Sequence, residues 1–240
     1  MTYPKVLLAA PTSHVKAYCF WDWIVNIKSF TYPNLDILLV DNSPGTEYFE
    51  YLKKVSGIRV IHVNPGKRTT QEFITESQNK MRDIALEEGY DYLFSLESDV
   101  FPTVRDIVER LMDHNVEVVT APYMIGQGKD SGLLIGYQVQ SWIAKNALFG
   151  VILPANYGFF LMDGSLKAVN QSGIGCTLIH RDILEQVTFR FEKGLASHSD
   201  SFFYTDLWYL GVTAYIDTSL YCHHENQDWS YVHNTWREHN

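Results

Sequence analysis

The sequence YDYLFSLESDV, residues 90–100, decides the fold and the position of the candidate site. Its apolar and aromatic residues form a run of strand length, which is typical of a buried strand. The run ends in two carboxylates, Glu97 and Asp99. In open α/β sheets, ligands bind beyond the carboxyl ends of the strands. Residues two apart in an extended chain point to the same side, so Glu97 and Asp99 can converge on one ion.

The two carboxylates admit two interpretations. Oxygen ligands suit hard divalent cations such as Mg²⁺ or Mn²⁺, which commonly bridge to phosphates. In the alternative, the acids stabilise the start of the next helix, because negative charge is favourable there. That helix is expected over residues 103–114, where Thr103 and Asp106 have the spacing of a capping box and an apolar stripe follows.

Strands and helices alternate along the first half of the chain. Short apolar runs predict strands at residues 5–10, 35–40, 58–63, 90–96 and 117–121. The segments between them predict helices at residues 15–30, 47–54, 70–88 and 103–114. The first strand is expected to end at Pro11. This alternation is typical of a mostly parallel sheet flanked by helices.

The second half is less regular. Residues 126–175 are rich in glycine, aromatic and β-branched residues and predict strands and long loops, with a short helix following at 181–187. The chain has no repeat, linker or low-complexity segment. We therefore expect one domain, residues 1–240, in which a regular α/β half (1–122) adjoins a smaller, irregular β-rich half (123–240).

Composition narrows the class of protein. The 240 residues carry a formal net charge of -9, with 46% hydrophobic and 20% charged residues, which excludes a disordered chain. The acidic balance lacks the basic footprint of a general nucleic-acid-binding protein. No apolar run approaches the roughly 18 residues of a membrane span, and the N-terminal sequence predicts a strand rather than a signal peptide. Three widely spaced cysteines predict neither a disulfide framework nor a cysteine zinc site, so we expect a reducing, cytoplasmic location.

An ordered set of segments resembles one enzyme family. The strand that ends in Glu97-Ser98-Asp99 is accompanied by KVLLAAPTS (5–13), LLVDNS (38–43), SQNKMRDIAL (77–86) and SGIGCTLIHRDIL (172–184). Over nearly the whole chain, this set resembles the nucleotide-sugar-dependent glycosyltransferases with the GT-A fold, particularly the family-2-like members. The resemblance implies a Rossmann-like α/β sheet, with nucleotide binding in the first half and acceptor binding in the second.

For the donor, the resemblance implies a nucleoside diphosphate sugar, with UDP as the default nucleotide and Mn²⁺ or Mg²⁺ as cofactor. Glu97 stands where the family usually has Asp, and its side chain is one methylene longer. Direct binding to the cation therefore stays open for Glu97, as does contact with the ribose or a metal-bound water. The implied donor contacts are Pro11, Thr12, Asp41, Arg82, Glu97, Ser98 and Asp99.

Later segments contain two further candidates. Asp200 resembles the acidic residue that lies beside the acceptor in the family, and a carboxylate there can act as general base for an attacking hydroxyl. Asp206, six residues later, is its competitor, with capping or surface charge as the simpler explanation. His224 follows Asp217 by seven residues, the spacing at which the family often completes its metal site, and His223 is the fallback. The implied cation ligands are Asp99, His224 and Glu97.

Other residues are weaker candidates. Gly173 and Gly175 permit a close backbone approach or a positive φ, and an ordinary turn is the alternative. Lys67 and Arg68 are candidates for contact with the donor phosphates, with a solvated basic loop as the simpler explanation. Trp142 and Tyr157 are candidates to stack on a sugar ring, with core filling as the alternative. The remaining candidates to line the site are Glu225, Asp228, Trp229 and His233.

These features predict a metal-dependent enzyme that moves a sugar from a nucleoside diphosphate donor to a hydroxyl acceptor, with inversion. Retention stays open, and the acceptor can be a glycan, a lipid, a metabolite, a protein or a modified DNA base. A non-catalytic nucleotide- or sugar-binding module and a nucleotidyltransferase are the competing functions. Nucleotidyl transfer favours a Gly-rich, basic loop after the first strand, and PTSHVK (11–16) is poor in both features.

Overall fold

The computed structural model describes residues 2–125, 132–137, 152–154, 162–194 and 198–225. Its centre is a sheet that begins with four parallel strands in the order β3-β2-β1-β4. These strands are β1 (Val6–Thr12), β2 (Leu35–Asp41), β3 (Arg59–His62) and β4 (Tyr92–Leu96). The parallel α/β architecture expected for the first half is therefore confirmed.

The sheet continues into the second half of the chain with mixed directions. Strand β11 (Cys176–His180) lies between β4 and β6 (Val118–Thr120) and is antiparallel to both. Beyond β6, the parallel strand β12 (Ala214–Asp217) follows. The remaining strands are antiparallel to their neighbours: β10 (Leu166–Ser172), β8 (Gly132–Tyr137), β7 (Met124–Ile125) and β9 (Ile152–Pro154).

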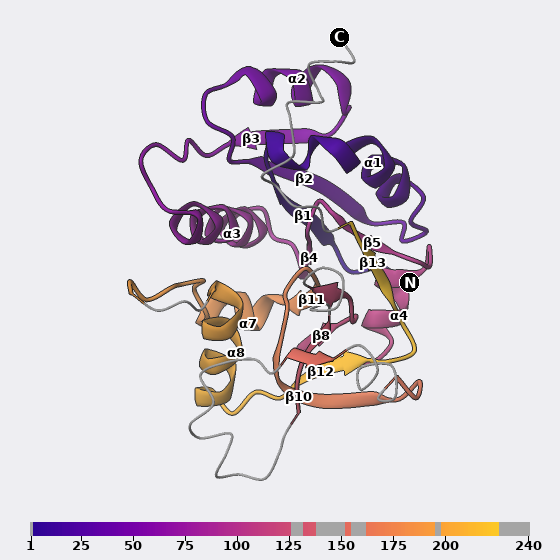
Figure 1. Ribbon diagram of the computed structural model, residues 1–240. Helices are drawn as coiled ribbons and strands as arrows, with labels where there is room; N and C mark the ends of the chain where they lie inside the picture. The colour runs from indigo at the N-terminus through magenta and orange to yellow at the C-terminus, as the bar shows by residue number, and fades with distance from the viewer. Residues whose placement is uncertain (1, 126–131, 138–151, 155–161, 195–197, 226–240) are drawn as a thin grey trace.

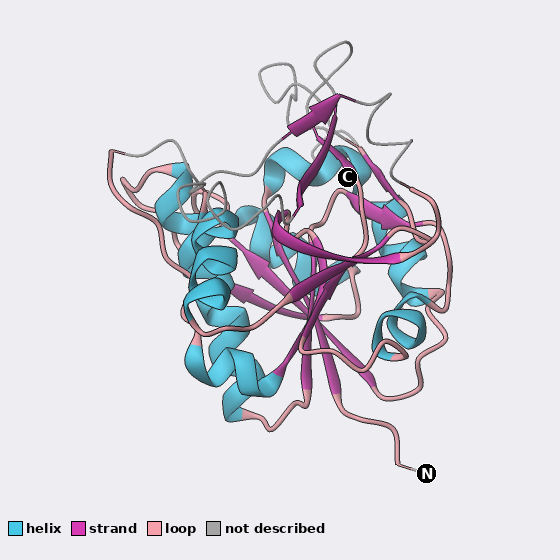
Figure 2. Cartoon of the chain, turned by 90° about the horizontal axis from the view of Figure 1, so that it is seen from below, coloured by secondary structure: helices cyan, strands magenta, loops and turns pink. Residues whose placement is uncertain are grey.

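Helices cover both faces of the sheet (Figure 2). One face carries α3 (Thr70–Glu87), α7 (Arg181–Gln186) and α8 (Ser199–Tyr209), and the other carries α1 (Phe20–Lys28), α2 (Glu47–Val55) and α4 (Ile107–Met112). Alternate residues of β1 supply the two cores: Leu7 and Ala9 face the α3 side, and Val6, Leu8 and Ala10 face the α1 side. Among the described helices, none has the length and apolar composition needed to cross a bilayer.

The start of α4 differs from the sequence-based expectation. The helix begins at Ile107 rather than Thr103, and Asp106 makes no side-chain capping bond. The Thr103 hydroxyl instead donates to the carbonyl of Tyr221 at 2.8 Å. Residues just before Thr103 are held extended, because β5 (Val100–Pro102) pairs with β13 (Cys222–His224). Glu97 and Asp99 thus precede a strand, and the helix-capping interpretation of these acids is wrong.

The β5–β13 pair brings the end of the described chain back to the centre of the molecule (Figure 1). In this antiparallel pair His224 lies opposite Val100, and the Glu225 amide donates to the Asp99 carbonyl at 2.9 Å.

The predicted helix at 15–30 is divided into a 3-10 helix, η1 (His14–Cys19), and α1. Both η1 and β13 therefore reach the carboxyl ends of β1 and β4.

Candidate active site

A cavity of about 490 Å³ opens at the carboxyl edge of the parallel strands. Its wall includes Pro11 and Thr12 from the end of β1, Asn42 after β2, and residues of η1 and of the first turns of α3. Glu97, Ser98 and Asp99 after β4 close one side together with His224. A volume of this size suits a small-molecule ligand of nucleotide dimensions.

Three side chains in this wall form a potential cation site. One ligand atom each from Glu97, Asp99 and His224 lies within 4.8 Å of the other two. Asp99 is fully buried, and its Oδ1 has no hydrogen-bond partner among the described residues. A buried carboxylate oxygen without a partner is costly unless a ligand satisfies it. Two carboxylates and an imidazole suit a divalent ion such as Mn²⁺, so these residues fit the expected metal.

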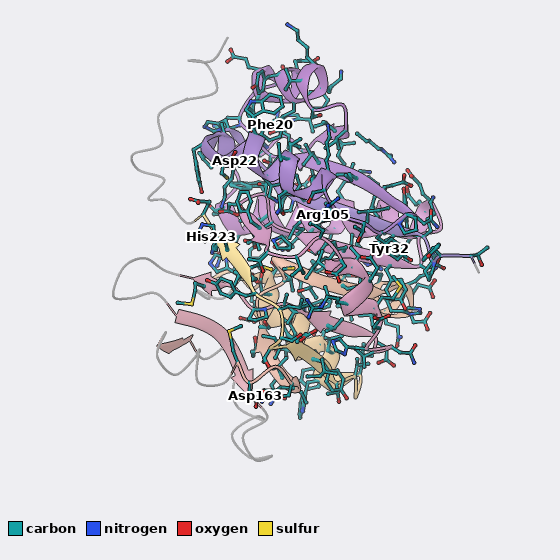
Figure 3. All side chains as sticks on the ribbon, turned by 90° about the vertical axis from the view of Figure 1, so that its right-hand side faces the viewer. Phe20, Asp22, Tyr32, Arg105, Asp163 and His223 are labelled. Carbon is teal, nitrogen blue, oxygen red and sulfur yellow. The ribbon has the colours of Figure 1, made fainter. Side chains whose placement is uncertain are left out.

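The backbone orients His224 for this role. Its Nδ1 lies 2.6 Å from the carbonyl of Met124, and because a carbonyl only accepts, Nδ1 carries the proton. Nε2 then faces the Asp99 Oδ2 at 3.3 Å. A second hydrogen bond that fixes the ring is the usual arrangement of a metal-binding histidine. His223 points away, is exposed (Figure 3) and pairs with Glu225 at 2.8 Å, so the geometry favours His224 over the fallback.

Burial and neighbouring charges shift the pKa values of the two carboxylates in opposite directions. Burial raises the pKa of Asp99, but the hydrogen bond with His224 and the charge of Lys16 outweigh it and hold that pKa below its usual value. Burial, with the charges of Asp99 and Asp200, raises the pKa of Glu97 to about 7. Burial lowers the pKa of His224, but its hydrogen bond with Asp99 and the nearby carboxylates raise it overall. Two acids two residues apart thus differ strongly in their affinity for a proton.

Tyr123, which the sequence did not single out as a candidate, is the reason that residues 173 and 175 are glycines. The Gly175 amide donates to the Tyr123 hydroxyl at 3.0 Å, and the Tyr123 ring meets the His224 ring edge-on at a centroid distance of 5.5 Å. A Cβ at Gly175 would lie 2.5 Å from the Tyr123 Oη and 3.0 Å from the Glu97 Cδ. At Gly173 it would lie 2.1 Å from the same Oη. Close approach, rather than positive φ, explains both glycines.

Asp200 lies beside this glycine segment. It is in the first turn of α8, and its Oδ2 accepts a hydrogen bond from the Ile174 amide at 3.2 Å. Burial raises its pKa, and its charge contributes to the raised pKa of Glu97. Asp206 is instead held by Arg190 through two bonds of 2.9 and 2.8 Å, which matches the structural role preferred for it.

Two of the implied donor contacts are not brought to the cavity. Asp41 is fully buried, and its oxygens accept from Ser43 at 2.6 Å and pair with His62 at 2.7 Å; its neighbour Asn42 is the residue in the wall. Arg82 points to the other side of α3, where its Nε donates to the carbonyls of Leu184 and Val187 at 2.7 and 2.8 Å.

Asn79, one helical turn before Arg82, likewise bonds the backbone of Phe189 through both atoms of its amide. These side chains fasten α3 to α7 and to the segment after it. Arg68 does line the cavity, where it forms an ion pair with Glu76. The candidates Trp142, Tyr157, Asp228, Trp229 and His233 lie outside the described residues.

Comparisons with known proteins support the fold. No protein-family model and no curated protein matches the sequence. The structure of GalNAc-T7 with UDP, GalNAc and Mn²⁺ matches 92% of this chain with a TM-score of 0.60 at 11% identity. The structure of S. aureus TarS residues 1–349 in complex with UDP-GlcNAc matches 95% of it with a TM-score of 0.55 at 13% identity. This chain covers 44% and 61% of those two chains, respectively.

These likenesses establish a GT-A-like fold for the chain. Within that fold, the carboxyl edge of the sheet carries a nucleotide-sized cavity and a potential Glu-Asp-His cation site. The class that fold and site define is therefore that of GT-A-like proteins with a potential acidic cation site.

Proposed function

We propose that this protein is a metal-dependent glycosyltransferase, family-2-like, that moves a sugar from a UDP-linked donor to a hydroxyl acceptor with inversion. The observation that carries the proposal is the convergence of Glu97, Asp99 and His224 in the wall of one cavity. The structures of similar fold were determined with UDP-GlcNAc, and with UDP, GalNAc and Mn²⁺.

Asp99 and His224 would hold the cation, with Glu97 as the third group within reach. When bound, a divalent ion offsets the negative charge that a leaving diphosphate gains as the glycosidic bond breaks. Asp99 suits this role because its low pKa keeps it ionised across the physiological range. The hydrogen bond from His224 to Met124 leaves Nε2 directed at the same position.

The nucleotide would occupy the remainder of the cavity. Pro11, Thr12 and Ser98 line it, as the resemblance implies, and Asn42 takes the place expected for Asp41. Asp41 would act indirectly, by fixing the turn after β2 through Ser43. Arg82 has no part in donor binding in this proposal, because the carbonyls at the end of α7 engage its guanidinium.

Asp200 is the proposed general base. It stands outside the group of potential cation ligands in the described residues, yet close enough for its charge to raise the pKa of Glu97. The raised pKa of Asp200 itself favours proton uptake from an acceptor hydroxyl. A base that is separate from the cation ligands is the arrangement needed for direct attack on the donor sugar and hence for inversion.

The test is Mn²⁺-dependent hydrolysis of UDP-sugars, with water in place of the unidentified acceptor. The wild-type protein should release UDP only with a divalent cation, and Asp99→Asn and His224→Ala should abolish the release. His223→Ala, an exposed neighbour, and Asp22→Asn, on the outer side of α1 (Figure 3), are the matched controls and should retain it. UDP binding without any turnover would instead favour the non-catalytic module, and turnover that persists in both site variants would contradict the proposal.

A further inference from the structure

Lys16 forms the charge partner of the buried carboxylate in the candidate cation site. It belongs to η1, which follows β1 directly, and its Nζ contacts the Asp99 Oδ2 as an ion pair. The Lys16 side chain is 16% exposed and that of Asp99 is 0% exposed. A buried carboxylate needs such a partner, because an uncompensated charge in the interior is strongly destabilising.

One oxygen of Asp99, Oδ2, has both Lys16 and His224 as neighbours. Asp99 Oδ2 contacts Lys16 and also faces the His224 Nε2 at 3.3 Å, while Oδ1 has no partner among the described residues. A divalent cation held between Asp99 and His224 would therefore sit directly beside the Lys16 ammonium. Two positive charges so close together repel each other, so an ion at Asp99 disfavours the position that Lys16 has in this structure.

A nucleotide bound in the cavity would offer Lys16 a second anionic partner. Its side chain lines the same cavity as Thr12 and Ser98, in which the proposed function places the nucleotide. Lysine carries a compact charge with three donors on a flexible stem, and it binds phosphate as a point charge. A divalent ion and one lysine together would balance the charge of Asp99 and of a sugar diphosphate, which bears two negative charges.

We propose that Lys16 exchanges partners: it neutralises Asp99 when no divalent cation is bound, and it contacts the donor diphosphate when the cation occupies Asp99. This inference rests on the proposed function and adds a diphosphate-contacting residue to it. Lys16 then weakens the binding of the cation alone and strengthens the binding of the nucleotide once the cation is bound. A purely structural Lys16 would not have opposite effects on the two ligands.

Calorimetry on Lys16→Met tests the exchange. Without nucleotide, the variant should bind Mn²⁺ about tenfold more tightly than wild type, because Lys16 no longer competes for Asp99. When saturated with Mn²⁺, the variant should bind UDP about tenfold more weakly, because one charge-assisted contact with the diphosphate is lost. Lys53→Met, which removes an exposed lysine of α2 paired with Glu50, should change neither affinity. Equal or parallel changes in the two affinities of Lys16→Met would overturn the inference.

A measurement on the wild-type protein covers the case in which Lys16→Met does not fold. Reductive methylation of lysine amines, followed by mass spectrometry, should modify Lys16 faster with Mn²⁺ alone and more slowly once UDP is added. Unchanged Lys16 labelling in a protein that binds both ligands would overturn the inference and leave the proposed function intact. A wild-type protein that binds neither Mn²⁺ nor UDP would overturn both.

Discussion

Replacing Gly175 with alanine should disturb the candidate site through Tyr123. The added Cβ would lie 2.5 Å from the Tyr123 Oη, 2.8 Å from its Cζ and 3.0 Å from the Glu97 Cδ. Tyr123 is buried and bonded to the Gly175 amide, so its ring cannot move without losing contacts. The alanine methyl therefore pushes against both the tyrosine and a potential cation ligand.

The size of the effect follows from three contributions. Overpacking a buried site costs about 1–3 kcal/mol, and loss of the Tyr123 hydrogen bond costs about 1 kcal/mol more. Alanine recovers about 0.4–1 kcal/mol by restricting the unfolded chain, because Gly175 has no positive φ. We expect a net loss of about 1–3.5 kcal/mol in the free energy of unfolding, accompanied by weaker Mn²⁺ binding.

A double-mutant cycle measured by urea unfolding checks this reasoning. Tyr123→Ala alone should cost about 3–5 kcal/mol as a large-to-small change in the core. Because the Gly175→Ala methyl then no longer meets the Tyr123 ring and is opposed by Glu97 alone, the double variant should be more stable than the two single changes predict, by about 1–3 kcal/mol. Additive costs would refute the steric explanation of Gly175.

Three further predictions concern single carboxylates and one arginine. Asp200→Asn should retain calorimetric UDP binding while sugar transfer or hydrolysis falls by about 10²–10⁴-fold, and near wild-type turnover would remove Asp200 from its role. Burial raises the pKa of Asp217, but hydrogen bonds from Ser219 and His114 outweigh it and lower that pKa overall. The contribution of ionised Asp217 to the free energy of unfolding is therefore present at neutral pH and is lost as the pH falls through the lowered pKa. Asp217→Asn should accordingly lower the urea midpoint at pH 7 and converge with wild type in strong acid; a constant difference at all pH values would contradict this. Arg82→Met should lose about 1–3 kcal/mol of unfolding free energy with unchanged UDP affinity, and a selective loss of UDP binding would restore its donor role.

The parallel half of the fold was predictable because each strand is a local apolar run. The ends of the strands were less so. Strand β1 continues through Pro11 to Thr12, although proline was expected to end it. Its pairing with β4 stops at Ala9, so the missing N–H of Pro11 costs no bond on that side, while Pro11 still lies opposite Val40 of β2.

The pairing between segments that lie far apart in the chain could not be predicted from the sequence. The run CTLIH predicts a strand, but nothing local indicates that β11 enters between β4 and β6 in the antiparallel direction. In the same way, Thr103 and Asp106 have the spacing of a capping box, yet the Thr103 hydroxyl donates a hydrogen bond to the carbonyl of Tyr221, which is more than a hundred residues away. Contacts between distant segments override local propensity in both cases.

The candidate site shows the same division. Glu97 and Asp99 were predictable because strand ends and two-residue spacing are local properties. The orientation of His224 depends on the Met124 carbonyl and on the β5–β13 pair, so the sequence placed it only by resemblance. Arg82 shared a helix with cavity residues, but its position on α3 turns it toward α7, a contact that only the packed structure reveals.

A crystal of the protein grown with Mn²⁺ and UDP, measured at a wavelength where manganese scatters anomalously, would locate the cation relative to Asp99 and His224. One anomalous peak is expected within coordination distance of both the Asp99 carboxylate and the His224 Nε2, next to density for the diphosphate. An ordered UDP in this cavity with no peak between these two side chains, or a peak elsewhere on the chain, would contradict it.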